Sequence, residues 1–128
     1  MQISSAGTDH GIALAEVYDR TPARSANRIT NLSTRAHVGT DQAIVIPGVV
    51  VDGDGTQRLL VRAIGPSLSQ FGVSGVLPNP GLRIYNAAGQ VVAENMTWGT
   101  GPNSDAAALT TAAQKSGAFA LARGTADA

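Results

Sequence analysis

Turn-forming residues divide the chain into short runs in which apolar and polar positions alternate. Gly, Pro, Asn and Asp recur roughly every 8 to 14 residues, and the runs between them have the two-residue period of β-strands. In the run 11–19, Glu16 is the single charge on an otherwise apolar face. The run 42–51 is apolar on both faces, and Pro47 within it predicts a bulge or bend because proline cannot donate to a β-ladder. Further strands are predicted at 28–38, 59–65, 81–86, 90–95 and 118–122.

One segment, 104–116, has the pattern of a helix instead. Ser104 is a suitable N-cap, Lys115 lies near the C-terminal end, and Gly117 stops the helix. Its apolar stripe consists mostly of alanine, which favours a short helix that caps the open end of a sheet structure. The predicted fold class is therefore all-β: a β-sandwich of the jelly-roll or Ig-like kind, with about eight strands and one capping helix near 104–116, forming a single domain over 1–128.

Composition and charge exclude several kinds of chemistry and argue against several kinds of binding partner. The chain has no cysteine, which excludes disulfides, thiolate nucleophiles and cysteine-ligated metals. Nine basic residues balance nine acidic ones, so nucleic acid and anionic membrane are not expected partners. No run of 18 or more apolar residues predicts a membrane span, and the first residues lack the regions of a signal peptide.

The candidate motifs for chemistry are all incomplete. The DGDG sequence at 52–55 begins like a calcium loop, but Gln57 and Ala63 stand where the loop needs a glycine and an acid, so we expect a hairpin turn. Neither Ser67 nor Ser74 sits in a nucleophile elbow. Four acids, Glu16, Asp19, Asp41 and Glu94, could pair as catalytic carboxylates, yet nothing fixes their separation. We therefore expect no enzymatic activity, no metal and no cofactor.

Two residues have both a structural and a functional interpretation. Trp98 is the one aromatic residue in a glycine-rich loop, and it either plugs the end of the predicted sandwich or contacts a sugar. Arg62 is a lone charge in an apolar strand and needs a carboxylate partner if it is buried. Glu16 is the candidate, so the sequence predicts a planar, bidentate Glu16–Arg62 ion pair.

Several segments resemble a tandem repeat found in large secreted and surface proteins of bacteria. The segments are ALAEVYD (13–19), ANRITNLSTRAHVG (26–39), the long stretch 59–89 that contains RAIGPSL and FGVSG, and SGAFAL (116–121). The closing region of that repeat is similar to bacterial pre-peptidase C-terminal domains, which are β-sandwiches. The resemblance implies an extracellular or cell-surface location. It also implies that a closing strand normally follows the position of Ala128 and that this unit lacks it.

A sandwich without its closing strand would expose an unpaired edge, which another copy or a neighbouring repeat could fill by strand addition. The expected contact edges are Gln2, Ile3 and Ser4 at one end and Ala126, Asp127 and Ala128 at the other. The sequence thus predicts a non-enzymatic structural module of a bacterial fibre, adhesin or stalk, which self-assembles into a homo-oligomer or filament. The alternative is a carbohydrate-binding module of a secreted multidomain protein, with glycans as partners and Trp98 as a contact.

Overall fold

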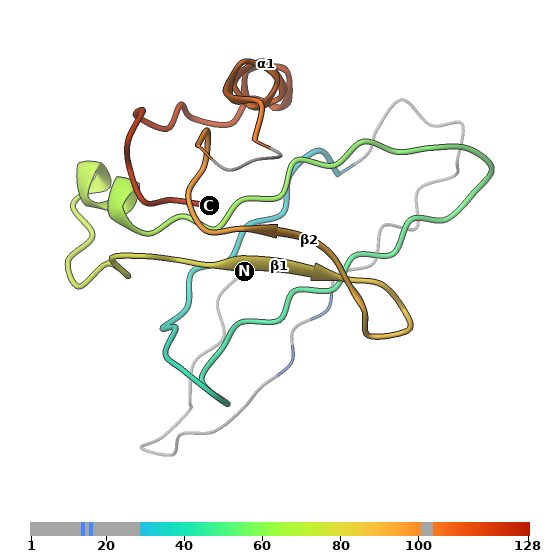
Figure 1. Cartoon of the computed structure of the whole chain (residues 1–128), viewed down its shortest axis with the longest axis horizontal. Helices are drawn as coiled ribbons and strands as arrows, with labels where there is room; N and C mark the ends of the chain where they lie inside the picture. Colours follow the sequence, from blue (N-terminus) through green and yellow to red (C-terminus); the bar gives the residue numbers. More distant parts are fainter. Residues whose placement is uncertain (1–13, 15, 17–28, 101–103) are drawn as a thin grey trace. The chain divides into compact units, whose positions relative to one another are not determined.

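Regular secondary structure occupies the stretch from Pro66 to Ser116 in the computed structural model, which describes residues 14, 16, 29–100 and 104–128 (Figure 1). The elements are the 3₁₀ helix η1 (Pro66–Phe71), the strands β1 (Leu82–Tyr85) and β2 (Val91–Asn95), and the helix α1 (Ala106–Ser116). Contacts divide the chain into two units, 1–33 and 34–128, and all four elements belong to the second.

The strands β1 and β2 form an antiparallel hairpin, as the sequence predicts. The side chain of Asn86 holds the turn, since its Oδ1 accepts the N–H groups of Ala88 and Gln90, each at 3.0 Å. Gly89 supplies the positive φ of 75° that this turn requires. Across the strands, the exposed side chains of Arg83 and Glu94 form an ion pair in register. An isolated two-stranded hairpin is only marginally stable, so this one depends on what packs around it.

The predicted helix exists, although its N-cap lies one residue later than expected. Asp105, not Ser104, caps α1: its Oδ1 accepts the N–H groups of Ala107 at 2.9 Å and of Ala108 at 3.1 Å. The helix ends at Gly117, which has a φ of 72°. The following N–H of Ala118 donates to Ala113 O at 2.9 Å, which completes a Schellman motif.

The prediction of an eight-stranded sandwich is wrong. The runs 28–38, 42–51, 59–65 and 118–122 form no β-ladder among the residues that the structure describes, and the run 11–19 lies outside them apart from residues 14 and 16. Alternation and β-branched residues indicate an extended backbone, but a ladder also needs a partner strand at the correct distance and register. In the described chain that condition is met only by β1 and β2.

The segment after Gly65 begins with η1. Proline fixes φ near the helical value, which suits Pro66 to the first position of a helix. Ser69 Oγ then donates to Pro66 O at 2.7 Å, and Gln70 Nε2 donates to Ser67 O at 2.8 Å. Gly72, with a φ of 75°, ends the element.

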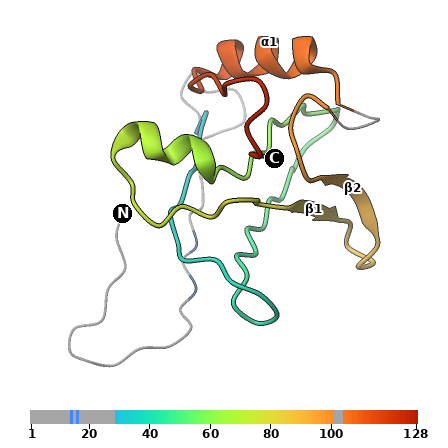
Figure 2. The same cartoon turned by 60° about the vertical axis from the view of Figure 1, so that its left-hand side comes forward.

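The most buried residues gather where the end of the chain meets the segment leading into η1. Figure 2 shows this last segment returning past α1 to lie beside the strand-like residues before Pro66. Ser67, Trp98, Asp127 and Ala128 are buried there, and the side chain of Asp127 is 0% exposed.

Candidate functional site

The end of the described chain is fixed to the RAIGPS stretch by backbone hydrogen bonds. Ala63 N donates to Ala128 O at 2.6 Å, and Ala128 N donates to Ala63 O at 2.9 Å. Each of these two residues thus donates to and accepts from the other, as in a single bonded pair of antiparallel strands, although no ladder forms here in the described chain. Trp98 N donates to Asp127 O at 2.7 Å, so the residue before Ala128 also holds the loop after β2.

The carboxylate of Asp127 organises the turn into η1. Its Oδ1 accepts the N–H of Gly65 at 2.8 Å and of Ser67 at 3.3 Å, and its Oδ2 accepts the hydroxyl of Ser67 at 2.5 Å. Glycine is required at position 65, because a Cβ there would lie 2.1 Å from Leu77 O. Burial on its own would raise the pKa of Asp127, but the hydrogen bonds, that from the Ser67 hydroxyl first among them, bring it below its usual value.

Ser67 and Asp127 do not form a catalytic pair in this arrangement. Ser67 is buried, and its hydroxyl is already donated to a carboxylate that has no exposed surface. A serine nucleophile needs a base that can accept its proton and an open approach for the substrate. This cluster therefore acts as a structural anchor, which we call the Asp127 anchor (Gly65, Ser67 and Asp127).

Arg62 lies next to the anchor and contacts Phe119. Its Nη1 donates to Phe119 O at 2.7 Å, and its guanidinium carbon lies 4.7 Å from the centroid of the phenyl ring, a cation–π distance. Phe71 packs edge-on against the same ring, with centroids 4.9 Å apart. Burial lowers the pKa of Arg62, and the negative charge of Asp127 opposes that shift.

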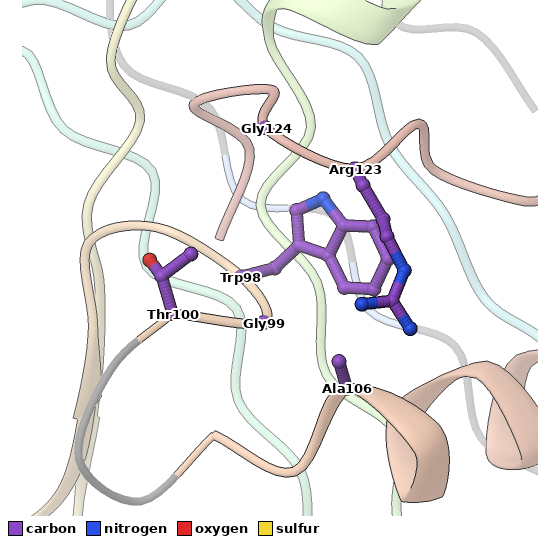
Figure 3. Close-up of a pocket in the computed structure, with 6 residues that line it drawn as sticks. All are labelled: Trp98, Gly99, Thr100, Ala106, Arg123 and Gly124. Carbon is purple, nitrogen blue, oxygen red and sulfur yellow. The ribbon is translucent and has the colours of Figure 1, made fainter.

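The indole of Trp98 is enclosed and its N–H is satisfied. The side chain is 8% exposed, and Nε1 donates to Ala122 O and to Thr125 Oγ1, each at 3.2 Å. Figure 3 shows the side chain of Arg123 running alongside the indole, at a pocket of about 70 Å³. That volume is well below the roughly 300 Å³ at which small-molecule sites begin. Trp98 therefore has a packing role at the end of the described chain, but it closes no sandwich, and the alternative sugar contact stays a prediction.

An apolar groove lies between α1 and the segment that precedes the anchor. Its lining includes residues 60–62, the α1 side chains of Leu109 and Ala113, and the later residues Ala118, Ala120, Leu121 and Ala128. The groove holds about 100 Å³. We call this feature the α1 groove.

A second unusual surface is the segment 44–51, which we call the apolar run. Its six large side chains are all exposed, with Ile46 at 82% and Val50 at 93%. No backbone hydrogen bond joins any of its residues to another part of the chain that the structure describes. Single exposed apolar residues are normal on protein surfaces, but a continuous exposed run is not.

The other predicted site residues are placed as follows. Glu16 belongs to the unit 1–33, so its ion pair with Arg62 stays a prediction. Gln2, Ile3 and Ser4 lie outside the described residues. Ala126, Asp127 and Ala128 form a tightly held end in which the last two residues bond to the chain's own Ala63 and Trp98, and their predicted role in a subunit contact stays a prediction.

The RAIGPS stretch stands out in the sequence, but the sequence does not identify the residue that holds its turn. Asp127 was expected to lie at a contact edge, and no local pattern connects it to a turn 62 residues earlier. The one available signal was the Gly-Pro-Ser turn itself, whose amide and hydroxyl donors needed an acceptor.

Residues 14, 16, 29–100 and 104–128 contain no cluster of three or more His, Cys, Asp or Glu side chains that could hold a metal ion. Within those ranges, no helix has the length and apolar character needed to cross a bilayer. Comparison of the chain with protein-family models, with curated proteins and with solved structures found no match in any of the three.

Proposed function

We propose that this chain is a non-enzymatic structural module of an extracellular bacterial fibre, adhesin or stalk, and that it associates with copies of itself or with neighbouring repeats by strand addition. The observation that carries this proposal is the apolar run, because its backbone donors and acceptors have no partner within the described chain and its side chains are exposed. An exposed, extended, uncharged segment of this kind is a template for pairing with another chain.

The Asp127 anchor supports a structural role over a catalytic one. Its serine and its carboxylate are buried against each other, and no substrate could approach them without opening the turn. The extracellular location rests on the resemblance of the RAIGPSL and FGVSG segments to repeats of bacterial surface proteins.

Sedimentation velocity of the full chain over a wide range of concentrations tests the proposal. We expect dimers and larger species whose proportion rises with concentration, and filaments or regular oligomers by electron microscopy of the same samples. A chain that stays monomeric at every concentration and melts cooperatively would contradict the proposal.

A further inference from the structure

We propose that Met96 is a modification site at which a peroxide oxidises the thioether to the sulfoxide, and that this oxidation loosens the open end of the β1–β2 hairpin. The chain has two methionines and no cysteine, so these two thioethers are its peroxide-sensitive sulfur atoms. The inference does not depend on the proposed self-association, and its test does not involve assembly.

Met96 lies at the end of the hairpin that is opposite the turn. The β1–β2 ladder ends with Leu82 opposite Asn95. Continued by one step, the same register places Gly81 opposite Met96. A Cβ built on Gly81 would lie 2.8 Å from Met96 Sδ and 3.4 Å from Met96 Cε. The thioether thus fills the space that a side chain at position 81 would occupy, and it packs the segment after β2 against the segment before β1.

Hydrogen bonds fix the backbone on the C-terminal side of this contact. Asn95 Oδ1 accepts the N–H of Thr97 at 2.9 Å, and Thr97 Oγ1 donates to Met96 O at 2.7 Å. The next residue, Trp98, is buried and donates its N–H to Asp127 O at 2.7 Å. A change at the Met96 sulfur therefore acts at the junction between the hairpin and the buried region around Trp98.

The exposure of Met96 and the contact with Gly81 together determine the effect of oxidation. Met96 is 47% exposed, and the susceptibility of methionine to oxidation follows its exposure. The sulfur attacks one peroxide oxygen, so an S–O bond forms, the O–O bond breaks, and the second oxygen leaves as water while the sulfur loses two electrons. The product is larger and polar, and the sulfur already contacts Gly81 too closely for an oxygen to fit between them. The oxidised side chain should therefore leave Gly81 for water.

Treatment of the full chain with hydrogen peroxide tests the modification. Mass spectrometry of its peptides should find one added oxygen at Met96, formed at a rate within about 3-fold of that of free methionine. Urea denaturation followed by Trp98 fluorescence should then show an unfolding equilibrium constant at least ~3-fold larger. Methionine sulfoxide reductase should reverse that shift. Met96→Leu conserves the volume but has no sulfur, so peroxide should leave its urea transition unchanged.

A glycine variant with a matched control tests the contact itself. Gly81→Ala places a methyl group where the sulfur lies, which should move the thioether into solvent. Met96 should then oxidise at least ~2-fold faster, and its oxidation should no longer shift the urea transition. Gly48→Ala is the control, because no described atom lies within 4 Å of a Cβ at that position, and neither glycine has a φ in the left-handed region.

Three results would overturn the inference. They are a Met96 that reacts far more slowly than free methionine, an oxidised chain whose urea transition equals that of the untreated chain, and an oxidation effect that persists in full in Gly81→Ala. Far-UV circular dichroism checks that Gly81→Ala keeps its helix. If it does not, the comparison of the wild type with Met96→Leu decides alone.

Discussion

The Asp127 anchor and the apolar run show opposite relations between composition and burial. The anchor is built from glycine, serine and aspartate, and it includes the most completely buried side chain that the structure describes. The apolar run consists of isoleucine and valine around Pro47 and Gly48, and its large side chains are exposed. In these two segments, burial therefore follows satisfied hydrogen bonds and not the amount of apolar surface.

The physical reason lies in what each segment can do with its backbone. The turn at Gly65 has amide and hydroxyl donors that one carboxylate can satisfy together, so burying them costs little. The apolar run has unpaired N–H and C=O groups that would have to be buried along with its side chains. Without a partner strand, the cost of burying these unpaired N–H and C=O groups offsets the gain from burying the apolar side chains.

Loss of Trp98 is expected to have the largest effect on the stability of the anchored region. Trp98→Ala removes a buried indole and should lower the free energy of unfolding by about 3 to 5 kcal/mol. Urea denaturation followed by circular dichroism measures the change. Phe71→Ala is the control, since Phe71 is 58% exposed and should cost clearly less. Equal costs would mean that the region around Trp98 is not the core.

Removal of the anchor carboxylate should have the second-largest effect on the free energy of unfolding. Asp127→Ala leaves the Gly65 amide, the Ser67 amide and the Ser67 hydroxyl without an acceptor, which at roughly 1 kcal/mol or more for each donor amounts to about 3 kcal/mol. Fluorescence of Trp98, the single tryptophan, can follow the urea transition. Asp54→Ala, at an exposed turn, should leave the midpoint unchanged. An effect of similar size at both positions would rule out the anchor.

The contact between Arg62 and Phe119 should contribute less. Arg62→Lys keeps the charge but loses the planar group above the ring, and we expect a cost of about 1 to 2 kcal/mol. Arg58→Lys is the exposed control. Introducing Glu16→Gln into the wild type and into Arg62→Lys tests the predicted Glu16–Arg62 ion pair by a double-mutant cycle. Coupling above roughly 0.5 kcal/mol would support it, and strict additivity would oppose it.

Acidification should weaken the anchor before it affects the apolar run. The pKa of Asp127 is depressed in the folded chain, so its contribution to stability is fully present above the unfolded pKa of about 3.9 and is lost as the pH falls through the lower folded value. Stability should therefore lose this contribution below about pH 4. The difference between wild type and Asp127→Asn, measured by urea denaturation at each pH, isolates this carboxylate. A constant difference down to pH 2 would contradict the assignment.

The smallest effect is expected in the apolar run. Ile46→Ser removes a large side chain that is 82% exposed, and its cost to the dilute chain should stay within about 0.5 kcal/mol. Urea denaturation at low concentration, where association is minimal, makes this measurement. A cost comparable to that of Trp98→Ala would show that the run is packed and would remove the contrast with the anchor.

Sequence reasoning succeeded where the determining contacts are local. The hairpin is encoded by Asn86 and Gly89 within its own turn, and the end of α1 by Gly117. It failed for the sandwich, because periodicity in the run 42–51 indicates an extended backbone but does not show which strand would pair with it. It failed for the anchor for a related reason, since Asp127 carries no local mark of the turn that it holds.

The 62 residues that separate Gly65 from Asp127 also impose a delay during synthesis of the chain. At translation rates of roughly 5 to 20 residues per second, the Asp127 carboxylate is made about 3 to 12 s after the RAIGPS turn that it holds. The valines at 49–51 are already made by then. The order of synthesis thus exposes the apolar run before the carboxylate that holds the RAIGPS turn has been made.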